Sequence, residues 1–171
     1  MHFHKILDTS PYVKNPKSII QRQAVRAIIV NENKILLIQT NRGDYKLPGG
    51  GVEENESYAE ALIREVREET GYINCIVKDL FGIVIERKMD KFESDYLFQM
   101  ASYYYICVLT NKETVHQALD AYETVQEFKP KWVNLENAII KNETLITQSK
   151  VNSWLKRETL VLNEVKEFVK I

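Results

Sequence analysis

The sequence has few of the features that mark a secreted, membrane-spanning or nucleic-acid-binding protein. Its two cysteines, Cys75 and Cys107, match no zinc-ligand spacing. No apolar run approaches the ~20 residues that span a bilayer, and the N-terminus shows no apolar signal segment. The formal net charge is −1, so no global field attracts DNA or a membrane surface. We therefore expect a cytoplasmic protein with no membrane or DNA partner, in which both cysteines are buried reduced thiols; a disulfide is the alternative.

Glycine is also scarce, and its distribution is uneven. Three of the six glycines are consecutive, at Gly49–Gly51. Because glycine lets the backbone approach a ligand or metal closely, this turn is the first candidate for a functional site. The length of 171 residues fits a single domain over residues 1–171.

Hydrophobic patterning predicts a mixed α/β fold in which helices cover a sheet. Asn55 or Ser57 can cap a helix that ends before Gly71, and the stretch 110–126 has no clear pattern. We expect His2 and His4 to lie in a disordered chain end. The expected strands are 23–30 and 34–39, paired as a hairpin, then 72–86, 96–109 and 131–133, and the expected helices are about 57–70, 135–141 and 150–169.

The helix over 57–70 combines an apolar stripe with an acidic one. The apolar stripe at i, i+3, i+4 and i+7 is predicted to be buried, and the carboxylates lie beside it at the edge of the core. The apolar stripe consists of Ala59, Leu62, Ile63 and Val66, and the acidic stripe consists of Glu65, Glu68 and Glu69.

This concentration of acid is costly for an isolated helix. Seven glutamates and two arginines occur between Glu53 and Glu69. Glu65 and Glu69 are like charges at i, i+4, and Glu68 and Glu69 lie at the negative end of the helix dipole. A solvated acidic face is the simplest interpretation. A bound hard cation such as Mg²⁺ explains more, because it removes the conflict and accounts for the adjacent glycine turn.

A longer motif contains these residues. From Gly50 the sequence has five residues, then Glu56, seven residues, and Arg64-Glu65-Val66-Arg67-Glu68-Glu69-Thr70-Gly71-Tyr72. It resembles the Nudix box, GX5EX7REUXEEXGU with U an aliphatic residue, at every position but the last. The resemblance extends over about residues 23–140, and the terminal helix at about 150–169 lies outside its specific part.

The resemblance implies an α/β/α sandwich with a mixed sheet, and Mg²⁺ or Mn²⁺ held by a loop–helix–loop. By the family pattern the metal ligands are Glu65, Glu68, Glu69 and the carbonyl of Gly49, with Glu68 and Glu69 also catalytic. The box is supported by Gly50, Glu56, Arg64 and Gly71. Such proteins hydrolyse a nucleoside diphosphate linked to another group, by attack of water on phosphorus.

The sequence offers more than one candidate for the general base. One of the box glutamates can serve, and relatives also use a carboxylate on the loop before the late tryptophan strand. Here Glu127 lies five residues before Trp132, with Glu123 and Asp120 further upstream. We favour Glu127, with Glu123 as the second choice.

The substrate is predicted by elimination. The chain lacks the proline that ADP-ribose-specific members tend to carry after the box, and the dinucleoside polyphosphate, coenzyme A and NADH signatures are also missing. A (deoxy)nucleoside triphosphate is the leading choice. Arg26 and Lys46 are the candidate phosphate contacts, although we favour surface salt bridges for both. One of Tyr103–Tyr105, or Phe81, can stack on a base, although we favour packing in the core.

Three alternatives to this enzyme follow from the same residues. One is a hydrolase of ADP-ribose or sugar nucleotides, and another attacks the 5′ end of RNA. The third is a nucleotide-sensing module without turnover, although such modules generally lose box glutamates and this chain keeps them all. Family relatives are often homodimers, so a homodimer is an expectation by analogy.

Overall fold

The computed structural model describes residues 1–9, 18–89, 96–148 and 152–169. Helices are interleaved with groups of strands along the chain, as the hydrophobic patterning predicts. The strands are β1 (Phe3–Asp8), β2 (Ser18–Asn31), β3 (Lys34–Gln39), β4 (Tyr45–Lys46), β5 (Cys75–Met89), β6 (Tyr96–Leu109) and β7 (Lys129–Val133); the helices are α1 (Tyr58–Thr70), α2 (Ala121–Val125), α3 (Leu135–Ile146) and α4 (Leu155–Phe168).

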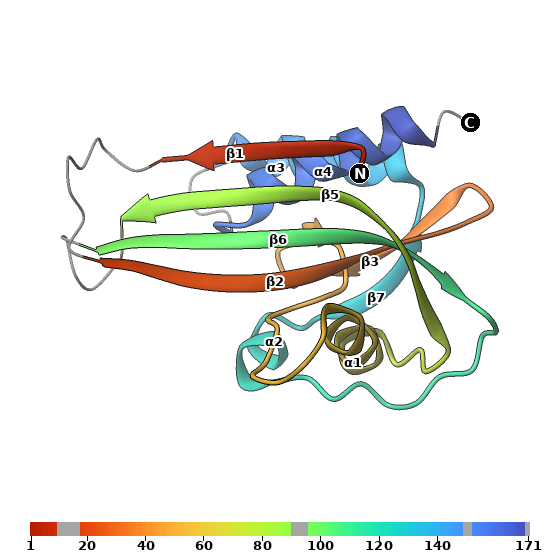
Figure 1. Ribbon diagram of the computed structural model, residues 1–171. Helices are drawn as coiled ribbons and strands as arrows, with labels where there is room; N and C mark the ends of the chain where they lie inside the picture. Colours follow the sequence, from red (N-terminus) through yellow and green to blue (C-terminus); the bar gives the residue numbers. More distant parts are fainter. Residues whose placement is uncertain (10–17, 90–95, 149–151, 170–171) are drawn as a thin grey trace.

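The strands form one mixed sheet in the order β1-β5-β6-β2-β3-β4, and β7 pairs with β3 (Figure 1). The pairs β1–β5 and β2–β6 are parallel, and the others are antiparallel. The predicted hairpin is confirmed, because Val30 of β2 pairs with Ile35 of β3.

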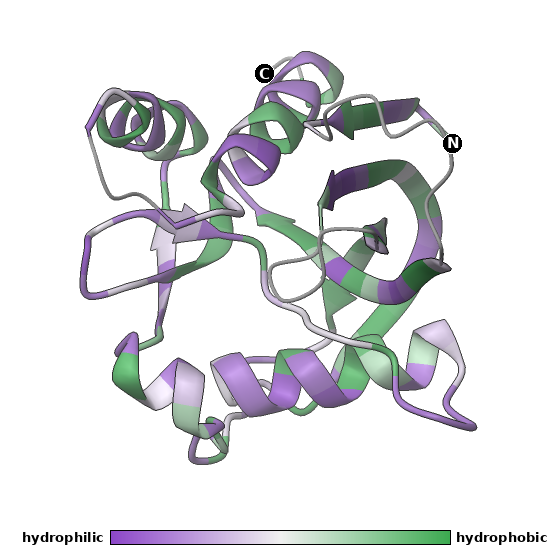
Figure 2. Cartoon of the chain, turned by 90° about the vertical axis from the view of Figure 1, so that its left-hand side faces the viewer, coloured by the Kyte–Doolittle hydropathy of each residue, from purple (hydrophilic) through white to green (hydrophobic). Residues whose placement is uncertain are grey.

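Helices cover both faces of this sheet, and each face has its own core. Ala27 and Ile29 of β2 pack on the α1 side, whereas Ile28 points to the side of α3 and α4, as the alternation of a strand requires. Figure 2 shows the helices above and below the strands. The α/β/α sandwich with a mixed sheet is therefore confirmed.

Local signals fix both ends of α1. The Ser57 side chain accepts a hydrogen bond from the Glu60 N–H, and the Glu60 carboxylate accepts one from the Ser57 N–H, which is a capping box. Gly71 ends the helix with φ 82°, a left-handed conformation that glycine adopts without steric cost. Of the two predicted caps, Ser57 is the one used.

The predicted buried stripe of α1 is partly wrong. Leu62 and Val66 are buried, but Ala59 and Ile63 are exposed. The remaining positions of the buried face belong to Ala61, Glu65, Glu69 and Thr70. The helix is thus rotated so that two of its carboxylates face inward, and the acidic stripe is not a solvated face.

The prediction for the first residues is also wrong. Phe3–Asp8 form β1, which runs parallel to β5, and His2 stacks on Phe81 with 5.1 Å between ring centroids. His4 lies in β1 with its side chain exposed. The stretch 110–126, which showed no pattern, contains α2.

The predictions for the two cysteines and for the aromatic side chains of the core hold. Cys75 and Cys107 are buried free thiols. Tyr104 is the tyrosine of its run that enters the core, and Phe81 is also buried. None of the helices in the described part of the chain has the length and hydropathy that a membrane span requires.

Candidate active site

Three carboxylates from two helices converge beside the glycine turn. Glu65 and Glu69 lie on the inward face of α1, and Glu123 comes from α2. One carboxylate oxygen from each lies within 4.8 Å of the others, and Glu69 is only 1% exposed. We call Glu65, Glu69 and Glu123 the acid cluster.

The segment before α2 is fastened to the C-terminal end of α1, and this brings Glu123 to the cluster. The Gln117 side-chain amide donates to the Glu69 carbonyl at 2.5 Å and to the Phe128 carbonyl at 3.1 Å. The Ala118 N–H donates to the Glu68 carbonyl at 2.9 Å. These bonds tie α1 to the start of β7 and fix the chain on either side of α2.

The glycine turn runs along the edge of β2 and presents its backbone to the acid cluster. The Val25 and Ala27 N–H groups donate to the carbonyls of Gly50 and Pro48 at 2.9 and 2.8 Å. The Gly49 N–H donates to Oε2 of Glu69 at 2.8 Å. At Gly50 an added Cβ would lie 2.4 Å from the Glu65 carboxylate oxygens, so only glycine leaves room for that side chain.

A buried lysine already shows that these oxygens surround a cation. The Lys46 ammonium donates to Oε1 of Glu69 and, at 3.3 Å, to the carbonyl of Gly49. These two groups are among the ligands predicted for the metal. Carboxylate and carbonyl oxygens are also the donors that Mg²⁺ and Mn²⁺ prefer, so the residues present fit a divalent metal.

Burial raises the pKa values of both α1 carboxyls in the cluster. For Glu69 this effect outweighs the ion pair with Lys46 and raises the pKa to about 7. Burial also raises the pKa of Glu65, and the adjacent Arg64 opposes it. A divalent ion would favour the charged form of each group.

Arg64 joins the parts of the predicted box. Its guanidinium donates to Glu56 at 2.8 and 2.9 Å, to Glu65 at 2.9 Å and to the Gly51 carbonyl at 3.0 Å. These bonds lower the pKa of Glu56. Arg64 thereby links Glu56 and the glycine turn to the face of α1 that carries Glu65.

Two predicted site residues lie away from the acid cluster. Glu68 is bound to Nη1 of Arg64 at 3.1 Å and lines a groove on the outer side of α1. Glu127 is exposed and pairs with Lys129 at 3.0 Å. Between the two loop candidates for the base, the structure therefore brings Glu123 to the cluster and leaves Glu127 outside it.

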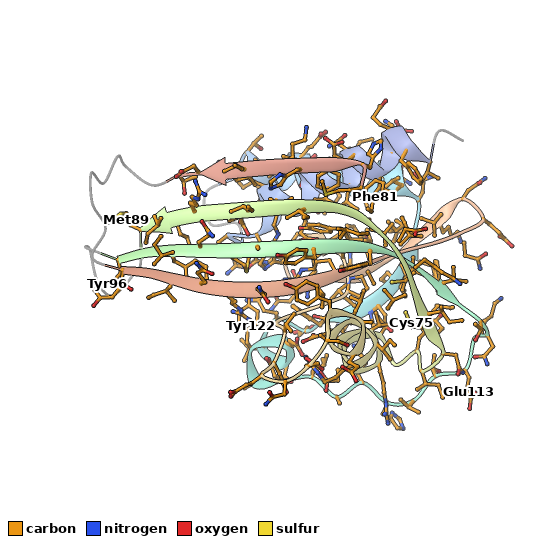
Figure 3. All side chains as sticks on the ribbon, in the orientation of Figure 1. Cys75, Phe81, Met89, Tyr96, Glu113 and Tyr122 are labelled. Carbon is orange, nitrogen blue, oxygen red and sulfur yellow. The ribbon has the colours of Figure 1, made fainter. Side chains whose placement is uncertain are left out.

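The acid cluster opens into a pocket of about 690 Å³. Arg26 and Lys46 both line it and are only 8% and 6% exposed, so the expected surface salt bridges are wrong for both. Tyr122, labelled on α2 beneath β2 in Figure 3, also lines the pocket. The other cationic and aromatic side chains of the lining are Arg22, Lys88, Arg157, Phe98, Phe128 and Trp154.

Sequence reasoning missed part of this lining. Arg22 on β2 and Arg157 on α4 carry no motif, because only the tertiary fold brings them to the box. Asp120 and Glu123 did carry a signal: an acidic pair at i, i+3 is an N-terminal capping pattern, and it forms the capping box of α2. That signal could have placed Glu123 at the start of a helix.

Comparison with known proteins gives one family. The NUDIX domain model matches residues 20–155. A segment of 64 residues is 48% identical to the ADP-ribose pyrophosphatase of Methanocaldococcus jannaschii, covering 35% of this chain and only 37% of that protein. The crystal structure of an ADP-ribose pyrophosphatase from Streptococcus suis superimposes with a TM-score of 0.55 at 20% identity, covering 88% of this chain and 92% of that one. The Escherichia coli dihydroneopterin triphosphate pyrophosphohydrolase gives 0.55 at 16% identity, covering 88% and 98%.

Proposed function

Because the chain belongs to the Nudix family, we propose that it is a Mg²⁺-dependent hydrolase that cleaves the diphosphate linkage of a small nucleotide-like molecule. The observation that carries the proposal is the acid cluster at a pocket that also contains cationic and aromatic side chains. A purely acidic pocket would repel a diphosphate. The observed lining instead offers carboxylates for a metal, guanidinium groups for phosphate and rings for a base.

The proposed metal ligands are Glu65, Glu69 and Glu123 with the carbonyl of Gly49. A bound Mg²⁺ would offset the charge of these carboxylates and polarise the phosphoryl oxygens. Without this ion, the Lys46 ammonium holds two of these ligand groups, the Glu69 carboxylate and the Gly49 carbonyl. Glu68 stays a ligand and catalytic residue predicted from the motif, and it would have to leave Arg64 to enter the pocket. Mn²⁺ as an alternative ion and a homodimer also stay predictions.

The chain's own residues supply positioning and proton transfer. Arg64 and the glycine turn hold Glu65, and the Gly49 N–H orients Glu69. Glu123 is the proposed base that takes the proton of the attacking water, because of the two loop candidates it is the one at the cluster. Most of the proposed rate enhancement comes from positioning and charge neutralisation.

We further propose a (deoxy)nucleoside triphosphate as substrate. The sequence lacks the signatures of the other substrate classes, and Arg22 and Arg26 are among the residues that line the pocket, so they can meet additional phosphate charge. ADP-ribose is the second candidate, since the Methanocaldococcus jannaschii relative is an ADP-ribose pyrophosphatase.

Product analysis separates the two candidates. The purified protein is incubated with Mg²⁺ and a nucleotide panel, and products are identified by mass. Pyrophosphate with a nucleoside monophosphate supports a triphosphate substrate, and AMP with ribose 5-phosphate supports ADP-ribose. No turnover with any compound would contradict the hydrolase and favour a nucleotide-sensing module.

A further inference from the structure

Helix α4 contributes a buried charge network to the pocket, although it lies almost entirely outside the family match over residues 20–155. Arg157 and Glu158, in its first turn, are 2% and 0% exposed. Oε1 of Glu158 accepts from Nε and Nη2 of Arg157 at 3.1 and 2.9 Å. Nη1 of Arg157 donates to Glu86 of β5. Charges buried this deeply are retained only when they are paired, as these are.

Glu158 also reaches the glycine turn. Its Oε2 accepts a hydrogen bond from the Leu47 N–H at 2.8 Å. Leu47 precedes Pro48 and Gly49, so this bond fixes the start of the turn that meets the acid cluster. A single carboxylate of α4 thereby links the helix to the backbone of the predicted metal site.

The same carboxylate faces Arg26 of β2. Nε of Arg26 lies 3.9 Å from Oε1 of Glu158, too far for a hydrogen bond but close enough for charge attraction. Among the described residues, Nε and Nη1 of Arg26 have no hydrogen-bond partner, although both are buried. Arg26 lines the pocket, so its donors are held at the wall of the proposed substrate site.

Buried donors without partners are uncommon because each costs free energy. A guanidinium is also the group best suited to bind phosphate oxygens through two donors. We propose that Arg26 binds a phosphate group of the substrate and that Glu158 of α4 is the positioning residue that holds Arg26 in place. This inference rests on the proposed function, because it concerns the same pocket, and it makes α4 part of the active site.

Binding of inorganic pyrophosphate to the full-length, metal-free protein tests the inference without turnover. Isothermal titration calorimetry in EDTA is expected to detect binding to the wild type. Arg26→Gln should weaken it at least about tenfold, because charge-assisted hydrogen bonds are lost. Arg26→Lys should recover part of the affinity, since it keeps the charge but not the planar donors. Wild-type affinity in Arg26→Gln, or no binding by the wild type, would overturn the inference.

Glu158→Asp tests the positioning role, because it keeps the charge and withdraws the carboxylate. We expect it to weaken pyrophosphate binding about three- to tenfold, and the double variant with Arg26→Gln to bind no more weakly than Arg26→Gln alone. Additive losses would contradict action through Arg26. Glu164→Gln, on the same helix and paired with Lys5 at the surface, should bind like the wild type.

Two features keep this test decisive. Circular dichroism checks that each variant folds, and if Glu158→Asp does not fold, the two Arg26 variants decide the result. Binding is measured without hydrolysis, so the two proposals can fail separately. If the wild type is active and Arg26→Gln binds pyrophosphate normally, only the role of Arg26 is contradicted. Loss of the proposed function would instead appear as absent turnover with intact pyrophosphate binding.

Discussion

Glu69 combines three conditions that seldom occur in one carboxyl group: full burial, an ion pair with Lys46 and a hydrogen bond from the Gly49 N–H. Burial dominates and raises its pKa to about 7. Without a divalent ion, Glu69 is therefore partly protonated near neutral pH, and a cation bound next to its carboxylate would favour the charged form.

This pKa predicts the pH dependence of stability in the metal-free protein. Between about pH 4.5 and 7 the folded state binds more protons at Glu69 than the unfolded state, so the free energy of unfolding falls as pH rises through this range. Glu65 acts in the same direction. Urea unfolding in EDTA at several pH values measures the slope. Glu69→Gln should flatten it and Glu164→Gln should not; an unchanged slope in Glu69→Gln would contradict the burial argument.

The two loop glutamates allow a matched comparison at the residue scale. Glu123→Gln is expected to lower kcat about 100-fold or more, the range for loss of a general base. Glu127→Gln should lower it less than about threefold, because that side chain is exposed and pairs only with Lys129 among the described residues. Steady-state kinetics on the substrate found by product analysis measures both. The reverse order would contradict the assignment of Glu123 as the base.

At the scale of elements, the glycine turn has two adjacent glycines with different tasks. An added Cβ at Gly49 would lie 2.1 Å from the Val25 carbonyl oxygen, and its φ of 137° disfavours any side chain. At Gly50 the nearest atoms belong to the end of the flexible Glu65 side chain. Gly49 is therefore needed for the close approach of the turn to the backbone of β2, and Gly50 is needed to leave space for the Glu65 carboxylate.

We therefore expect the two alanine variants to affect different properties of the protein. Gly49→Ala should lower the free energy of unfolding by about 1–3 kcal/mol, since backbone must move. Gly50→Ala should leave stability within about 1 kcal/mol but weaken Mg²⁺ binding, because Glu65 is displaced. Urea unfolding and metal titration distinguish them. Equal destabilisation with unchanged metal affinity would contradict the assignment.

Local signals explain which elements the sequence could predict. Both ends of α1 follow from Ser57 and Gly71, whose effects act within a few residues. The rotation of α1 did not follow, because a hydrophobic pattern cannot foresee that Glu65 and Glu69 occupy inward positions. Helix α2 has only five residues, too few for a periodic signal.

At the scale of the whole molecule, long-range contacts account for the rest of what was missed. Strand β1 depends on parallel pairing with β5, which lies about 80 residues further along the chain. The local sequence of β1 cannot predict a pairing with so distant a segment. Arg157 likewise reaches the pocket, and Glu158 reaches Leu47 and Arg26, only because α4 packs against the sheet. The contiguous box thus predicted Glu65 and Glu69 of the acid cluster, whereas the parts contributed by Arg22, Arg157 and Glu158 needed the fold.

Strand β1 can be tested through its first residue. Phe3 is buried against Gly82 and Phe81, with 5.4 Å between the ring centroids of Phe3 and Phe81. Phe3→Ala should lower the free energy of unfolding by about 3–5 kcal/mol, as expected for a buried aromatic ring. Ile6→Ala, at an exposed position of the same strand, should cost less than about 0.5 kcal/mol. Equal stability of the two variants in urea unfolding would mean that β1 is not docked.

The proposed function depends on a divalent ion that the acid cluster binds. Isothermal titration calorimetry of the metal-free protein with Mg²⁺ or Mn²⁺ measures this binding. We expect saturable binding by the wild type, and at least about tenfold weaker binding by Glu65→Gln and by Glu69→Gln, because each substitution removes a charged ligand. Wild-type affinity in both variants, or no metal uptake even with pyrophosphate present, would contradict it.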